Sequence, residues 1–228
     1  ASNTNDNNYL VNWVSETNEL KLTQESTAPG SSNQGDVVDM GTFGFQQLNA
    51  GSFNDTDITF IRVTLIGTGS ASDVDSVSLY YDSACSGSGG TLIGTQPFTG
   101  NPPRAEFNSI SGATVEASAS SPPLRCINVE YNINSLASDG KTVGAEISSS
   151  AHVTNSEAYD FNSAYAPAVN LGTTSISGNT TQWTGASRTN WYTAVNWRVV
   201  CQPAVSIALL TTKPTTQLLA LEPPFVSP

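Results

Sequence analysis

The feature that most constrains the fold is a series of short segments in which apolar and polar residues alternate. In residues 73–81, Val77, Leu79 and Tyr81 share one face of an extended chain, and Ser76, Ser78 and Tyr80 share the other. The same alternation recurs farther along the chain, in residues 126–133 and in residues 141–147, the latter after an Asp-Gly turn. A period of two residues predicts half-buried β-strands.

Residues 57–66 differ because they are apolar on both faces. Ile58 and Phe60 fall on one face, and Ile61, Val63 and Leu65 fall on the other. This pattern predicts a central strand. Strands at this spacing, with Gly, Pro, Asn and Ser between them, predict an all-β fold: an antiparallel β-sandwich of the jelly-roll or immunoglobulin-like kind with an extended terminal strand segment.

The strand pattern also suggests a division of the chain. Residues 23–178 are expected to form the sandwich. Residues 1–22 hold an N-terminal strand segment, Tyr9–Val14, that could be exchanged between copies, and residues 179–228 form a Trp-rich C-terminal tail that could be donated to a neighbouring subunit.

The composition limits the partners. Charged residues make up only 12% of the 228 residues, and Ser, Thr, Asn and Gly take their place, which favours strands and turns over helices. A formal net charge of −11, with 8 Lys plus Arg, argues against nucleic acid and anionic lipid as partners. No stretch approaches the ~18 consecutive apolar residues of a membrane span.

Several features suggest an exported protein. The polar opening Ala1–Asn8 resembles a mature terminus left by signal cleavage, and lysine is scarce. Two sequons make Asn54 and Asn179 candidate glycosylation sites. We therefore expect an extracellular or cell-surface location.

Three cysteines, Cys85, Cys126 and Cys201, allow three pairings with one thiol left over. If residues 74–82, 92–97, 105–110 and 126–133 run alternately up and down, Cys85 and the start of the last strand lie at the same end of the sheet. We therefore favour a Cys85–Cys126 disulfide with Cys201 unpaired, and the other two pairings stay open.

Catalytic motifs are missing from the sequence. His152 is the only histidine and lies on an alternating segment, where a surface or boundary role is the usual one. No nucleophile elbow, zinc-binding His pair or phosphate-binding loop is present. We therefore predict that the chain is not an enzyme.

Acidic residues cluster where two predicted strands begin. Calcium prefers six to eight oxygen ligands, which loop carboxylates at a sandwich end can supply. The alternative is that these residues are turn and strand-edge acids that discourage aggregation. No other cofactor is expected, and the candidate calcium ligands are Asp55, Asp57, Asp73 and Asp75.

Residues 57–147 also contain a series of short motifs in a fixed order. The first are Val77-Ser-Leu-Tyr-Tyr-Asp82, a Gly-rich loop, and Leu92-Ile-Gly-Thr-Gln-Pro-Phe98. Val129-Glu-Tyr-Asn-Ile133 and Leu136–Val143 follow. This arrangement resembles a β-sandwich module of bacterial and archaeal extracellular filament and surface proteins. The resemblance implies the fold and says little about chemistry.

The tail carries another resemblance. Trp183–Trp191 and Asn196-Trp197 resemble the opening of Trp-rich repeat modules in secreted bacterial surface proteins, but too few residues follow for another core. Apolar tail segments flanked by prolines could instead complete a neighbour's sheet. The expected interface residues are Trp183, Trp191, Trp197, Val205, Ile207 and Leu209. Trp13, Trp183, Trp191 and Trp197 could also form a sugar-stacking platform, which we consider the weaker interpretation.

These observations favour a structural subunit of an extracellular filament or surface assembly that polymerises with copies of itself by donor-strand exchange. The alternative is an adhesin or carbohydrate-binding sandwich module of a larger surface protein.

Overall fold

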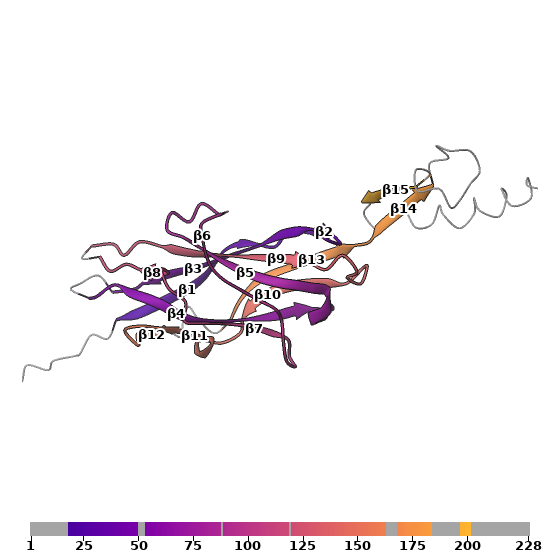
Figure 1. Cartoon of the computed structure of the whole chain (residues 1–228). Coiled ribbons are helices and arrows are strands. Elements are labelled where there is room, and N and C mark those ends of the chain that lie inside the picture. Colours follow the sequence, from indigo (N-terminus) through magenta and orange to yellow (C-terminus); the bar gives the residue numbers. More distant parts are fainter. Residues whose placement is uncertain are drawn as a thin grey trace, which may run out of the picture.

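The fold is known from a computed structural model, which describes residues 18–49, 53–87, 89–118, 120–162, 168–183 and 197–201. Over these residues the chain consists of strands joined by turns, with two short 3-10 turns, η1 (Ala71–Asp73) and η2 (Ser150–His152). Two sheets enclose one core, and a small third sheet lies beyond one end (Figure 1). The expected all-β sandwich is confirmed.

The first sheet has six strands. In spatial order they are β12 (Asp160–Phe161), β1 (Glu19–Thr27), β3 (Val37–Gln47), β9 (Arg125–Ile133), β5 (Val74–Asp82) and β6 (Thr91–Gln96). β9 pairs with β3 on one side and with β5 on the other, so it is the centre of this sheet.

The second sheet is built around the long strand β4. Its main path is β11 (Val153–Asn155), β4 (Thr56–Gly67), β10 (Thr142–Ile147), β13 (Val169–Ser177) and β2 (Ser31–Asn33), while β7 (Arg104–Asn108) and β8 (Thr114–Val115) also pair with β4. Phe60 is in register with Asn108 of β7 and with Thr154 of β11, so β4 is paired on both sides. This agrees with the central strand predicted from its sequence.

Among the described strands, the third sheet consists of β14 (Asn179–Trp183) and β15 (Trp197–Cys201), which pair antiparallel with each other. β14 follows directly from the end of β13 and leads away from the sandwich (Figure 1).

Both large sheets are mixed rather than purely antiparallel. β1 pairs with β12, and β13 pairs with β2, in parallel. These pairings involve two and three residues, and segments this short carry no periodic signal in the sequence.

The core is made of aliphatic and aromatic side chains from both sheets. Tyr131 of β9 is fully buried, and its hydroxyl donates to the backbone oxygen of Gly144 in β10 at 2.9 Å. The ring also meets Phe98 edge to face, with centroids 5.4 Å apart. Because the hydroxyl finds an acceptor in the opposite sheet, a phenol can be buried there without an unpaired donor.

Two expectations about element limits and faces need correction. Residues 19–22, expected in the N-terminal segment, belong to β1, because Leu20 and Leu22 alternate into the core. Ile58 was expected to share a face with Phe60, but Ile58 is buried and Phe60 is not, since the β4–β11 register shifts there. No helix among the described residues is long and apolar enough to span a membrane.

Candidate functional site

The four predicted calcium ligands lie at two separate places. Asp55 and Asp57 flank the first residue of β4, whereas Asp73 and Asp75 flank the first residue of β5, which follows the far end of that twelve-residue strand. Asp55 Oδ1 accepts a hydrogen bond from the backbone N–H of Ala117 at 2.8 Å, and Asp57 Oδ1 accepts one from Thr114 Oγ1 at 2.6 Å. The structure therefore does not unite the four carboxylates.

Asp73 is a buried carboxylate that organises a turn. It accepts hydrogen bonds from the backbone N–H of Ser70 at 2.7 Å, from the Ser70 hydroxyl at 2.8 Å and from the backbone N–H of Ser138 at 2.7 Å. Asp75 is exposed and accepts from Asn134 Nδ2 at 2.6 Å. In the described part of the chain, no group of three or more His, Cys, Asp or Glu residues is arranged to hold a metal ion. Calcium stays a prediction.

The favoured disulfide is present. Cys85 and Cys126 are bonded, with Cα atoms 5.1 Å apart, because Cys126 lies opposite Asp82 in the β5–β9 pair and Cys85 follows three residues later. Cys201 ends β15, and its side chain is not among the described ones.

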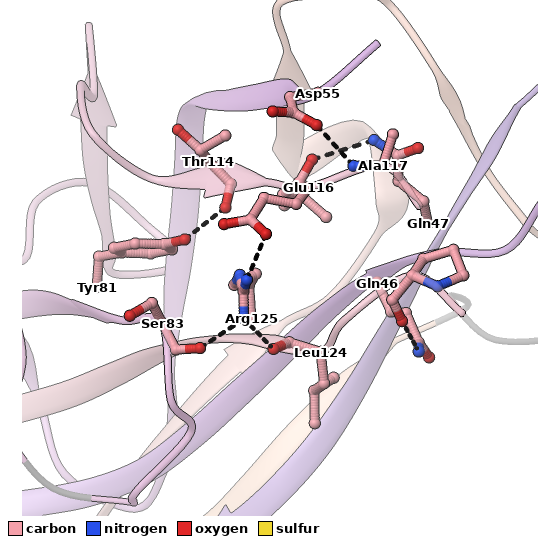
Figure 2. A network of polar contacts seen from close by, with 12 residues as sticks. Gln46, Gln47, Asp55, Tyr81, Ser83, Thr114, Glu116, Ala117, Leu124 and Arg125 are labelled. Carbon is pink, nitrogen blue, oxygen red and sulfur yellow. Dashed lines mark hydrogen bonds and ion pairs between the residues drawn. The ribbon is translucent and has the colours of Figure 1, made fainter. Parts of the chain in front are cut away.

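A polar network surrounds this end of the sandwich (Figure 2). Arg125 Nη2 lies 2.6 Å from Glu116 Oε2, and Arg125 Nη1 donates to the Ser83 carbonyl at 2.6 Å. Tyr81 Oη donates to the Thr114 carbonyl at 2.5 Å. These contacts tie the connection between β7 and β9 to the end of β5.

The imidazole of His152 has one hydrogen-bonding neighbour among the described residues. Its Nδ1 lies 3.1 Å from Ser148 Oγ. Burial and the nearby Arg62 guanidinium lower the pKa of His152, so the neutral imidazole predominates at neutral pH. The prediction that the chain is not an enzyme stays untested.

The two sequons lie in different surroundings. Asn54 is exposed just before β4, and its Nδ2 is 3.4 Å from Glu157 Oε2. Asn179 is the first residue of β14. Glycosylation of either stays a prediction.

The expected interface residues divide between described and undescribed parts. Trp183 and Trp197 are register partners in the β14–β15 pair. The other four interface candidates lie outside the described residues: Trp191, Val205, Ile207 and Leu209. The N-terminal segment 9–14 lies outside them too.

The structure adds an open sheet edge that the sequence analysis did not single out. β6 ends the six-stranded sheet and pairs only with β5 among the described strands. It contains neither a charged residue nor proline, which are two of the usual protections of an edge strand, but it does contain a third, a bulge. The strands that end the two sheets elsewhere have at most three residues, except β7, which carries Arg104 and Glu106.

β6 contains a β-bulge at Ile93. The register with β5 shifts there, so Ile93 packs against the core and Leu92 stays 54% exposed beside Tyr80. Gly94 faces the core closely enough that a Cβ would lie 2.9 Å from the Phe107 ring. The regular stretch available to a further strand is therefore Gly94–Gln96, with Leu92 as an exposed apolar neighbour.

In comparisons with known proteins, no protein-family model and no curated protein matches this chain.

Proposed function

We propose that this chain is a structural, non-enzymatic subunit of an extracellular filament or surface assembly, joined to copies of itself by strand addition. The observation that carries the proposal is the β14–β15 sheet. Among the described residues, its two strands pair only with each other, outside both sheets of the sandwich.

A two-stranded sheet is marginally stable in water by itself. It gains main-chain hydrogen bonds when one of its edges joins a larger sheet. A free strand pair linked to a complete sandwich by the continuous β13–β14 segment is therefore suited to reach a neighbouring copy.

β6 is the acceptor that best suits such a strand. Its regular stretch, Gly94–Gln96, can pair with three of the five residues of β14, and neither strand contains a charged residue. Two subunits with a net charge of −11 each repel, so an uncharged contact keeps the repulsion lowest where they touch.

A donor and an acceptor at different places on one chain make a head-to-tail contact. Such a contact builds an open filament unless the rotation between subunits closes a ring. The proposal thus gives a polymer rather than a two-fold dimer.

Electron microscopy of three versions of the protein tests this proposal: the full chain, a chain ending at Cys201 and a chain ending at Gly178. We expect fibres from the first two and none from the third, because only the third lacks β14 and β15. The sandwich strands end at Ser177, so circular dichroism and the retained Cys85–Cys126 bond should show that the shortest version still folds.

The other results are equally informative. Fibres from the full chain alone would move the donor to residues 202–228, and fibres from all three versions would move it to the N-terminal segment. Absence of fibres from every version would refute the filament.

A further inference from the structure

A small pocket lies on the outer face of the six-stranded sheet, where three neighbouring strands meet the Gly-rich connection between β5 and β6. Its volume is ≈ 200 Å³. The lining comes from β3, β5, β9 and that connection: Asp39, Tyr80, Gly89, Asn128, Val129 and Glu130.

Two carboxylates face each other at one side of this pocket. Asp39 of β3 and Glu130 of β9 are register partners, so their side chains lie on the same face of the sheet. Like charges directly opposite each other across a strand pair are destabilising. Any two polar side chains could occupy these outward positions of β3 and β9. The acidic pair lowers the stability of the fold, so folding does not explain its presence.

Within the part of the chain that the structure describes, each carboxylate accepts a hydrogen bond through one of its two oxygens. Asp39 Oδ1 accepts from the backbone N–H of Gly41 at 2.9 Å, and Glu130 Oε1 accepts from Tyr80 Oη at 3.1 Å. Among the described residues, no group donates to Asp39 Oδ2 or to Glu130 Oε2. The pocket therefore presents two strong acceptors beside each other.

A buried amide supplies a donor in the same pocket. Asn128 is only 3% exposed, its Oδ1 accepts from Thr42 Oγ1 at 2.7 Å, and its Nδ2 donates to the Gly89 carbonyl at 2.9 Å. These two bonds fix which end of the amide carries the hydrogens. The second Nδ2 hydrogen finds no acceptor among the described residues, so it is available to a ligand.

The partners that fit are groups that both donate and accept. We propose that this pocket binds a neutral saccharide, with two hydroxyl groups of one sugar ring donating to Asp39 and Glu130 and a ring or hydroxyl oxygen accepting from Asn128. Bonds from neutral donors to carboxylates are stronger than neutral pairs, and the Tyr80 ring adds an apolar surface. Anionic ligands are repelled, and the volume is below the ~300 Å³ of common ligand pockets, which limits the contact to a single ring.

This inference does not rest on the proposed filament. A subunit that polymerises and one that does not would present the same outer face, since the pocket uses β3, β5 and β9 and neither terminal segment.

Saturation-transfer NMR with methyl glycosides of glucose, galactose, mannose and N-acetylglucosamine tests the proposal on the full chain. We expect saturable binding of at least one glycoside. Asp39→Asn and Glu130→Gln should each weaken that binding about tenfold or more, because each removes a charged acceptor. The amide introduced by Asp39→Asn keeps an oxygen for the Gly41 N–H, so the strand should hold its shape.

Glu146→Gln is the matched control. It removes one carboxylate from β10, which belongs to the other sheet and does not line this pocket, and should leave binding unchanged. Absence of saturable binding for all four glycosides, or equal weakening by the control, would overturn the proposal. So would binding that disappears with a calcium chelator, since a bound cation and not the carboxylates would then contact the sugar. Binding that survives the chelator and depends on Asp39 and Glu130 would support it.

Discussion

At the scale of single residues, buried acids serve as acceptors for backbone N–H groups in turns. Asp73 binds Ser70 and Ser138, and Asp82 accepts from the backbone N–H of Ala84 at 3.0 Å and from the Ser86 hydroxyl at 2.7 Å. Burial acts to raise the pKa of both carboxyls, but these hydrogen bonds outweigh it and hold each pKa below the ordinary 3.8. Asp73 and Asp82 therefore stabilise the turns that hold their hydrogen-bond donors.

Asp73→Asn tests this role through its pH dependence. A folded pKa below the unfolded one gives stability that is present above pH 3.8 and is lost as the pH falls through the folded pKa. At about pH 7 we expect the variant to lose roughly 1–3 kcal/mol of unfolding free energy. Urea unfolding between about pH 7 and about pH 2.5 should show the difference in unfolding free energy between parent and variant shrinking, because the parent's carboxylate becomes protonated.

Asp75→Asn is the control for that series. Asp75 is exposed and its one described partner is the Asn134 side chain, so the change should cost less than about 0.5 kcal/mol at any pH. If the difference in unfolding free energy between the parent and Asp73→Asn stayed constant down to the lowest pH, the ionised Asp73 carboxylate would not be what stabilises the turn.

At the scale of elements, the exposed edge of β6 is the part of the sandwich best suited to accept a strand. A lysine on an edge strand opposes pairing with another chain, because its charge would be buried against the incoming strand. Leu92→Lys should therefore slow assembly of the full chain about tenfold or more, as followed by light scattering and sedimentation.

Leu136→Lys is the matched control for this variant. Leu136 is 89% exposed in the turn between β9 and β10, so the same chemical change there adds the same charge away from any strand. Equal slowing by both variants would assign the effect to net charge, and unchanged assembly by Leu92→Lys would remove β6 as the acceptor.

The individual strands could be predicted from the sequence because their signal is local. β5, β9 and β10 alternate within their own residues, and each appears where the alternation predicts it. Pairing is not local, and here the prediction was partly wrong. Residues 105–110 were expected to run in one sheet with β5 and β9, whereas β7 pairs with β4 because Ala105 and Phe107 pack into the core from the other sheet.

The disulfide prediction succeeded despite that error. It required only that Cys126 and the end of β5 share one end of a sheet, which direct pairing of β5 with β9 also provides. The pocket could not be predicted in this way. Asp39 and Glu130 lie far apart in the sequence, and each is an ordinary outward polar residue until the β3–β9 register places them opposite each other.

At the scale of the whole molecule, the charge of the chain opposes the assembly that we propose. Each copy carries a net charge of −11, so approaching copies repel each other. This repulsion extends over about one Debye screening length of the solution. Raising the ionic strength shortens that distance from about 30 Å at 0.01 M to about 8 Å at 0.15 M. Contacts made by uncharged strands such as β6 and β14 do not themselves weaken with salt.

We therefore expect the full chain to assemble several-fold faster in about 0.15 M NaCl than in about 0.01 M NaCl. Light scattering at fixed protein concentration measures the rate, and calcium chloride at matched ionic strength is the comparison. If the strand-end acids only stabilise turns, calcium should act as any other salt of that strength. An additional acceleration by calcium would favour the predicted metal site at Asp55, Asp57, Asp73 or Asp75. A rate that falls with salt would mean that oppositely charged surfaces join the copies, and would contradict assembly through the uncharged strands.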